Sequence, residues 1–492
     1  MSTNPSVKLK VQLAQDSQSV VADELITSKP AAKTGDALSQ AANERYRCPE
    51  KFFNLGINGQ LSNNEGYFRF GPDTICYGRS SAGTPASRAN ARLRDAFAGV
   101  QGDDTKLRLP FDLTEILDNL RLERYANGFV KESLLKKLAR KLYYRLRPLT
   151  NLAIRKQVQQ LYARNWRERP FPGWPVDTTV ENVFESVLLS SMKAKGAQEI
   201  PFVWFWPNGA RGCLTMTHDV ETEAGRDFCG TLMNVDDSFG IKAAFGIVPE
   251  ERYEVPPRLI KSIRSRGFEV AVQDLNHDGR LFDNQEEFLR RAKIINRYGR
   301  EFGARGFRAA ILYRKPEWYN ALEFEFDMSF PNVAPLDPQR GGCCTVMPFF
   351  IGDVLELPVT TTQDYTLFHV LNERSIDLWK LQTEMILSKN GLVSFIVHPD
   401  YILDPDKLSA YENLLGYLRE LREKSAVWCA LPSEINTWWR ARSKMSLVKD
   451  GDSWRIEGDG KERAVVAYAR NVEGKLVYQF AQRPEAGMPG QG

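Results

Sequence analysis

The sequence has few cysteines for its length and no long apolar run. Seven cysteines among 492 residues are too few, and odd in number, for a disulfide scaffold. Cys343 and Cys344 are adjacent and could form only a strained bridge, so we expect buried, reduced thiols there. No run of about 18 apolar residues occurs, which argues against a membrane-spanning helix.

The sequence also lacks an excess of charge of one sign. Its 66 Lys and Arg residues nearly balance 62 Asp and Glu residues, for a net charge of +4, so the charge does not favour nucleic acid as the main partner. The start, MSTNPSVKLK, has no apolar core behind a basic stretch and does not resemble a secretory signal. We expect a cytoplasmic protein that binds no nucleic acid, with peripheral membrane contact left open.

Composition divides the chain into four parts. Residues 1–45 are rich in Ser, Ala, Gln and Lys and are predicted to be a disordered tail. Residues 46–204 are predicted to be an N-terminal extension that is irregular or β-rich at first and then helical. Residues 205–445 form the main domain, and the turn signals of residues 446–492 predict a small β appendage and a tail.

The main domain alternates short apolar runs with amphipathic stretches. This alternation is typical of β/α units around a parallel sheet, and the number of units favours a barrel. We therefore predict an α/β fold, a distorted (β/α) barrel with a helical N-terminal extension. The expected strands are CLTMT (213–217), KAAFGIV (242–248), FEVAVQ (268–273), FRAAIL (307–312), EFEF (323–326), LELPVT (355–360), LVSFIVH (392–398) and VWCALP (427–432).

Polar residues gather where these strands end. Three of only four histidines, His218, His277 and His398, lie at or just beyond strand ends, and Asp327 follows another strand. In parallel barrels the loops after the strands build the functional site. The pattern predicts a site at this rim.

Four ordered motifs here resemble one family. THDVE (217–221), QDLNHDG (273–279), FRAA from Phe307 and VHPDY (397–401) are similar to motifs of the polysaccharide deacetylase (NodB-homology) family. The likeness covers about residues 205–440. It implies a distorted (β/α) barrel that removes acetyl groups from amino sugars, or hydrolyses related C–N bonds, usually with a divalent metal.

The resemblance also implies residue roles. Asp219 matches the general base that activates water, Arg308 matches the arginine that orients it, and His398 matches the general acid for the leaving amine. Glu221 and His277 match metal ligands.

Gln273 stands where the family has a second metal-binding histidine. Glutamine is a poor zinc ligand, so we expect zinc or a similar divalent metal to be weakly held or absent. Asp274 could replace the missing ligand as an oxygen donor. Asp274, Asp327 and His218 are candidate substrate-binding or altered ligand residues together with Gln273.

Other signals carry less weight. The spacing from Asp274 to Gly279 imitates an EF-hand loop, but the twelfth position is Gln285 instead of a bidentate glutamate. The tryptophans at 204, 206, 438 and 439 are expected to pack under the barrel, with sugar stacking as the alternative. Residues 131–169 contain twelve basic and two acidic residues, which indicates either a solvated basic face or contact with an anionic membrane.

The sequence therefore predicts a polysaccharide deacetylase-like hydrolase that removes N-acetyl groups from amino sugars of a bacterial surface or exopolysaccharide. Two alternatives stay open. One is a metal-independent C–N hydrolase of a smaller amide. The other is a catalytically silent carbohydrate-binding barrel in a glycan-assembly complex.

Overall fold

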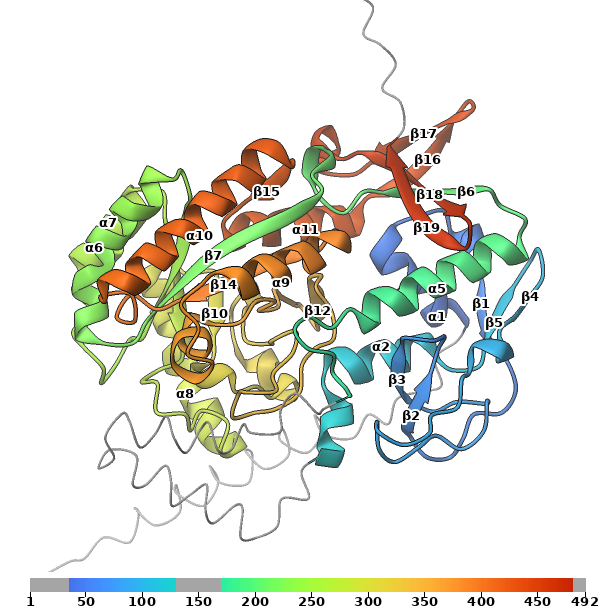
Figure 1. Cartoon of the computed structure of the whole chain (residues 1–492), viewed down its shortest axis with the longest axis horizontal. Helices are drawn as coiled ribbons and strands as arrows, with labels where there is room; N and C mark the ends of the chain where they lie inside the picture. The colour runs from blue at the N-terminus through green and yellow to red at the C-terminus, as the bar shows by residue number, and fades with distance from the viewer. Residues whose placement is uncertain (1–34, 130–169, 481–492) are drawn as a thin grey trace, which may run out of the picture.

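A curled, mostly parallel sheet forms the centre of the main domain. The computed structural model describes residues 35–129 and 170–480 (Figure 1). Eight strands of this sheet lie in the order β12-β13-β11-β10-β9-β8-β7-β14, and β15 also pairs with β7. Only the β12–β13 pair is antiparallel. The strands are β7 (Gly212–Val220), β8 (Ala243–Ile247), β9 (Glu269–Gln273), β10 (Gly306–Arg308), β11 (Phe326–Asp327), β12 (Phe349–Ile351), β13 (Val354–Glu356), β14 (Leu392–Val397) and β15 (Val427–Cys429).

Helices cover the outer face of this sheet (Figure 1). They are α6 (Glu223–Ser238), α7 (Pro257–Ser265), α8 (Gln285–Phe302), α9 (Asp377–Ser388) and α10 (Pro405–Lys424). Leu214 and Met216 of β7 share one buried cluster with Leu232 and Met233 of α6. Because side chains alternate along a strand, the residues between them, such as Thr215, face the barrel interior.

The barrel closes irregularly between β13 and β14. The chain after β13 lies beside β14, where Thr361 N donates to Ser394 O at 3.3 Å. The Thr360 hydroxyl donates to Leu392 O at 2.7 Å and accepts from Ser394 N at 2.9 Å. Side-chain hydroxyls thus replace part of the regular ladder, and the fold is a distorted (β/α) barrel, as predicted. A strand overlaps each of the eight expected runs, although β11 shares only Phe326 with the run 323–326 and the run from Phe307 leaves the sheet after Arg308.

Regular secondary structure begins closer to the N-terminus than predicted. Helix α1 (Gly35–Tyr46) lies within the expected tail, and its Ala42 and Tyr46 are fully buried. The tail prediction was wrong for residues 35–45, because this short segment buries a few apolar side chains although its composition is polar. The rest of the described extension contains β1 (Leu55–Ile57), β2 (Gly66–Arg69), β3 (Ile75–Gly78), β4 (Gln101–Gly102), β5 (Leu107–Leu109), α2 (Leu113–Arg121) and α5 (Thr179–Ala194).

The C-terminal appendage is β-rich, as predicted, and pairs with a distant segment. Its strands follow α11 (Pro432–Lys444). They are β16 (Ser446–Asp450), β17 (Ser453–Glu457), β18 (Val466–Val472) and β19 (Lys475–Phe480). Strand β18 pairs antiparallel with β6 (Glu199–Val203), which precedes the barrel, so the two ends of the main domain join in one three-stranded sheet.

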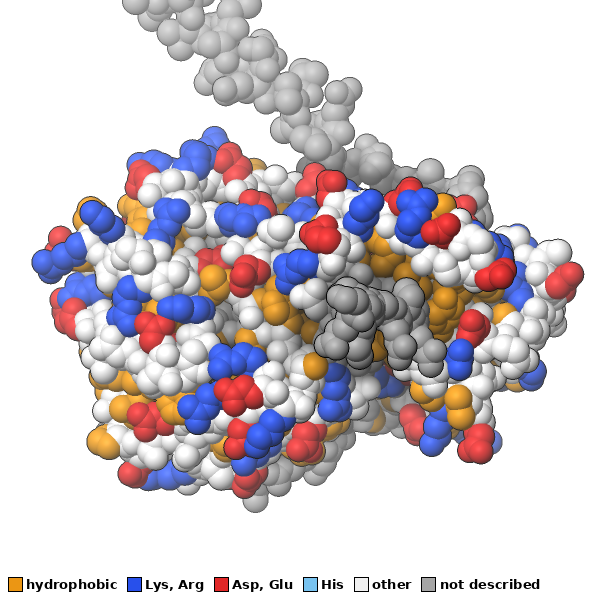
Figure 2. All heavy atoms as spheres, turned by 90° about the horizontal axis from the view of Figure 1, so that it is seen from above, with side chains coloured by type: hydrophobic (Ala, Val, Ile, Leu, Met, Phe, Trp, Pro, Cys, Tyr) orange, Lys and Arg blue, Asp and Glu red, His pale blue; other side chains and the backbone are white. Residues whose placement is uncertain are grey.

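Several side predictions can be compared with the structure. Cys343 and Cys344 are fully buried free thiols, and burial raises the pKa of both well above the usual range, as expected for inert cysteines. The tryptophans at 204, 206, 438 and 439 are buried, which confirms packing. The basic segment 131–169 lies outside the described residues. Among the described helices, none is long and apolar enough to cross a membrane. On the face in Figure 2, acidic and basic side chains alternate.

Candidate active site

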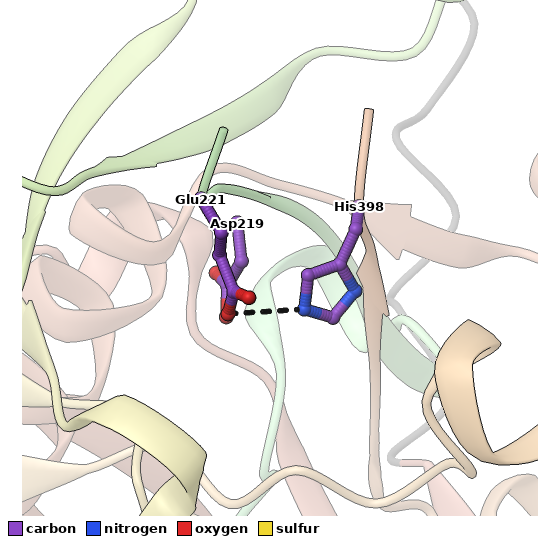
Figure 3. A group of neighbouring side chains, drawn as sticks. All are labelled: Asp219, Glu221 and His398. Atoms are coloured by element: carbon purple, nitrogen blue, oxygen red, sulfur yellow. Dashed lines mark ion pairs between the residues drawn. The ribbon is translucent and has the colours of Figure 1, made fainter. Parts of the chain in front are cut away.

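The candidate residues come from the carboxyl ends of four strands of the sheet, the neighbours β9 and β10 and the neighbours β7 and β14. Asp219 lies near the end of β7 and Glu221 directly follows it, while Gln273 ends β9 and Arg308 ends β10. His398 directly follows β14. Parallel strands present their carboxyl ends at one edge of the sheet, so these side chains meet at one rim. Figure 3 shows Asp219 and Glu221, from β7 and the residue after it, pointing toward His398 at the end of the neighbouring strand β14.

Asp219 and Arg308 form a buried ion pair. Arg308 Nη1 lies 2.6 Å from Asp219 Oδ1 and donates to the Thr217 hydroxyl at 2.9 Å. Its Nε donates to Met328 O at 2.9 Å, so the guanidinium is fixed in three directions. The side chains are only 1% and 4% exposed. The predicted pairing of Arg308 with Asp219 is confirmed.

Glu221 is the centre of a charged cluster. His277 Nε2 lies 2.7 Å from Glu221 Oε1, although the ring is not aligned for a hydrogen bond, and His398 Nε2 lies 3.4 Å from the same oxygen. Burial alone would raise the pKa of Glu221, but the two imidazoles outweigh it and hold that pKa well below the usual value. Burial lowers the pKa of His277, but Glu221 opposes this and the net shift is upward.

Gln273 stands where the family has a metal-binding histidine, and its side chain binds Glu221. Its Nε2 donates to Glu221 Oε1 at 3.0 Å. Its Oε1 is buried and has no hydrogen-bond partner among the described residues. The Gln273 amide nitrogen therefore orients the Glu221 carboxylate. The unpaired Gln273 Oε1 remains available as a neutral ligand for a cation.

Asp364, which the sequence did not indicate, holds His398. Its Oδ1 lies 2.6 Å from His398 Nδ1, and its Oδ2 accepts from the His398 backbone N at 2.7 Å. Burial lowers the pKa of His398, but Asp364 and then Glu221 outweigh it, and the pKa is raised well above the usual value. Because Asp364 is bound at Nδ1, Nε2 is the ring atom that faces the site.

The other three predicted site residues make their contacts elsewhere. His218 faces the outer side of β7, where Nε2 lies 3.0 Å from Asp236 and Nδ1 lies 3.1 Å from Val397 O. Asp327 accepts from the Ser329 hydroxyl at 2.7 Å. Asp274 accepts from Leu275 N at 2.6 Å. None of these hydrogen bonds is to Glu221, and of the three residues Asp274 alone lies near the cluster, where its charge helps to raise the pKa of His277.

Some of the backbone strain in the described residues lies near the rim. Asp274, His277, Ile311 and Leu312 all have positive φ, at 55°, 54°, 59° and 52°. This conformation is costly for residues other than glycine, above all for β-branched Ile311. Such strain clusters at functional sites, where the surrounding structure enforces a particular geometry.

The donor set fits a divalent cation. Oxygen or nitrogen atoms of Asp219, Glu221 and His398 all lie within 4.8 Å of one another. His277 lies against Glu221, and Gln273 has an unpaired buried oxygen. Carboxylates and imidazoles together are usual ligands of zinc and similar ions.

Among the comparisons with known proteins, only the comparison with solved structures gives matches. No family model and no curated protein matches the sequence. A protein assigned as a polysaccharide deacetylase from Mycobacterium smegmatis is 17% identical and covers 51% of this chain and 98% of its own, with a TM-score of 0.39.

Two further structures give similar values. PuuE allantoinase is 13% identical and covers 48% of this chain and 92% of its own, with a TM-score of 0.38. A protein assigned as a polysaccharide deacetylase in O-antigen biosynthesis, from Bordetella bronchiseptica, is 18% identical and covers 47% and 86%, with a TM-score of 0.29. These TM-scores are too low to support a function, which therefore rests on the site geometry. The structural neighbours of the barrel include several polysaccharide deacetylases, at low identity and over about half of this chain.

Proposed function

We propose that the protein is a hydrolase of C–N amide bonds that removes N-acetyl groups from amino sugars of a bacterial surface or exopolysaccharide. The observation that carries the proposal is the meeting of two supported groups at the carboxyl ends of the paired strands β7 and β14. Asp219 is held by Arg308 at 2.6 Å, and His398 is held by Asp364 at 2.6 Å. The motifs that resemble the deacetylase family place these same residues as base and acid.

Amide hydrolysis needs a base for water and an acid for the leaving amine. Asp219 accepts a proton from water while the water oxygen bonds to the carbonyl carbon, which gives a tetrahedral intermediate. His398 Nε2 then donates a proton to the nitrogen as the C–N bond breaks. The products are acetate and the free amine of the sugar.

The Asp219–Arg308 ion pair and the Asp364–His398 contact position the groups that carry out these reaction steps. Arg308 fixes the Asp219 carboxylate before substrate binds, so little reorganisation is needed. Asp364 accepts from Nδ1 and thereby directs the Nε2 proton toward the site. The raised pKa of His398 keeps its acid form populated at neutral pH.

A divalent cation would be held by Glu221 and His277. When bound, it would polarise the carbonyl oxygen and the attacking water as a Lewis acid. The proton transfers assigned to Asp219 and His398 stay with those residues.

One observation favours a second candidate, metal-independent hydrolysis of a smaller amide. Gln273, which stands where the family has a metal-binding histidine, donates to Glu221 Oε1 at 3.0 Å, and an amide is a weaker ligand for zinc than an imidazole. A carboxylate satisfied by protein groups has less need of a metal ion. Activity that persists after treatment with a chelator would support this candidate over a metal-dependent deacetylase.

The test is acetate release from fully N-acetylated chito-oligomers. Wild type and Asp377→Asn, which changes an exposed acid on α9, should release acetate at equal rates. Asp219→Asn should lower the rate by about 10²-fold or more. No release by the folded wild type would contradict deacetylation and favour a silent carbohydrate-binding barrel.

Membrane contact through residues 131–169 and a cytoplasmic location stay predictions.

A further inference from the structure

A strained turn follows Arg308 at the rim of the barrel. Ile311 and Leu312, here called the strained turn, are consecutive and have φ angles of 59° and 52°. Residues other than glycine keep this conformation only where the surrounding structure enforces it. The strained turn therefore needs an anchor elsewhere in the fold.

One side of the strained turn packs against the loop that carries His277. A Cβ atom on Gly279 would lie only 2.9 Å from Ile311 Cδ1, so this side chain lies directly on the glycine. Gly279 follows His277 by two residues. A shift of Ile311 would therefore disturb the loop that places His277 beside Glu221.

The other side of the strained turn packs near His398. Leu312 belongs to a small buried cluster with Val359 and Ile396. Ile396 precedes His398 by two residues on β14, so both side chains are on the interior face of this strand. The strained turn thus lies between the loop of one candidate histidine and the strand of the other.

Arg314 anchors the strained turn. Its Nη1 donates to Leu312 O at 2.6 Å, and its side chain is fully buried. Its backbone is fixed as well, because Arg314 N donates to Gln339 Oε1 at 3.1 Å and Gln339 Nε2 donates to Arg314 O at 3.2 Å. The guanidinium therefore holds the carbonyl of the second residue of the turn.

Glu123 of the N-terminal extension holds Arg314. Its Oε2 accepts from Arg314 Nε at 2.6 Å, and its Oε1 accepts from Arg314 Nη2 at 2.5 Å. Glu123 Oε1 also accepts from Gly342 N. The side chain of Glu123 is only 6% exposed. Such a buried, two-point pair fixes the plane of the guanidinium as well as its position.

This pair does more than attach the extension to the barrel. Attachment is already provided elsewhere, for example by Lys389 Nζ and Glu185 Oε2 of α5, which lie 2.7 Å apart. Lys389 lies just before β14, at the end of the barrel opposite the rim. Arg314, in contrast, uses its remaining nitrogen on the strained turn, so a contact of the extension is passed on to the rim.

We propose that Glu123 is a positioning residue, through which the N-terminal extension holds the strained turn in place beside the candidate active site. It acts through Arg314 and touches no reacting atom. The expected effect on turnover rests on the proposed function, whereas the effect on the strained turn can be measured without any activity.

The first test is amide hydrogen exchange, followed by mass spectrometry, in wild type and Glu123→Gln. Leu312 N and Tyr313 N donate within the turn at 3.3 and 3.1 Å, so these amides exchange only when it opens. Glu123→Gln leaves the buried guanidinium without its counter-charge. A peptide covering residues 309–315 should then exchange about 10-fold faster, and peptides from β7 and β8 should be unchanged.

Glu185→Gln is the matched control, because it also removes an ion pair between the extension and the barrel. Its 309–315 peptide should exchange as in wild type. If circular dichroism shows that Glu123→Gln is unfolded, Arg314→Lys replaces it, since lysine keeps the charge but loses the planar fork. Exchange of the 309–315 peptide at the wild-type rate in the folded variant would overturn the proposal.

The second test is acetate release from N-acetylated chitotetraose at a temperature where every variant is folded. Glu123→Gln should lower kcat about 10-fold and leave KM within about 2-fold, because small displacements of reacting groups slow the chemical step. Glu185→Gln should keep both constants. A raised KM with unchanged kcat would overturn the positioning role.

The two tests together separate the two proposals. Faster exchange in Glu123→Gln, without acetate release by wild type, would mean that Glu123 positions the strained turn but the proposed function fails. Acetate release with equal kcat in wild type and Glu123→Gln would support the proposed function and overturn the role of Glu123.

Discussion

Asp364 binds His398 twice, through the imidazole and through the backbone. The carboxylate oxygens lie 2.6 Å from His398 Nδ1 and 2.7 Å from its backbone N. One carboxylate therefore sets the charge of the ring and its position at the end of β14. In the proposed reaction, the acid strength of His398 depends on Asp364.

Asp364→Asn should lower turnover by about 10²-fold or more and move the alkaline limb of the pH–rate profile to lower pH. Asp364 raises the pKa of His398, so loss of its charge lowers that pKa, and the acid form disappears at lower pH. The measurement is the pH dependence of acetate release. An alkaline limb that stays in place would contradict the assigned role of His398.

Asp219→Asn should destabilise the protein by about 3 kcal/mol, because it leaves a buried guanidinium without its counter-charge. Asp237→Asn is the control, since Asp237 pairs with Lys242 and Arg266 where side chains are about one-third exposed. Exposed pairs contribute about 1 kcal/mol or less. Urea denaturation measures both changes. Equal losses for the two variants would mean that Arg308 does not depend on Asp219.

Gln273→His should raise zinc or cobalt affinity by at least about 10-fold, because it replaces a weak neutral donor with an imidazole. The wild-type protein is expected to be purified with little metal or with readily exchanged metal. Metal analysis before and after dialysis against a chelator, together with titration of both proteins, measures this. Stoichiometric, chelator-resistant zinc in the wild type would show that the present residues complete a firm site.

The basic segment 131–169 should bind anionic vesicles, and salt should weaken that binding, because attraction between basic side chains and anionic lipids is screened. Cosedimentation with phosphatidylserine-containing and purely phosphatidylcholine vesicles measures it at two salt concentrations. Equal binding to both vesicles would rule out this electrostatic contact.

The alternation of side chains between the two faces of a strand explains which candidate site residues meet and which do not. His218 and Asp219 are adjacent on β7, so only one of them can face the interior, and the structure turns His218 to α6. The sequence alone could have shown this conflict, but not which residue faces inward. The Asp219–Arg308 pair was predictable from the resemblance, because Arg308 matches the arginine that orients the general base.

Asp364 could not be predicted in the same way. It lies after β13 in a segment that has neither strand alternation nor helical periodicity, and it reaches His398 only because the irregular closure places this segment beside β14. Helix α1 was missed because its composition is polar, although a few of its side chains are buried in the core.

The central claim is that Asp219 and His398 act together to let water cleave an N-acetyl group. Its most direct test is hydrolysis of N-acetylated chito-oligomers in H2(18)O by wild type, Asp219→Asn and His398→Ala. We predict acetate and free amine in equal amounts with one 18O atom entering each acetate, and losses of about 10²-fold or more in both variants. Undiminished release by either folded variant, or acetate without 18O, would contradict the claim.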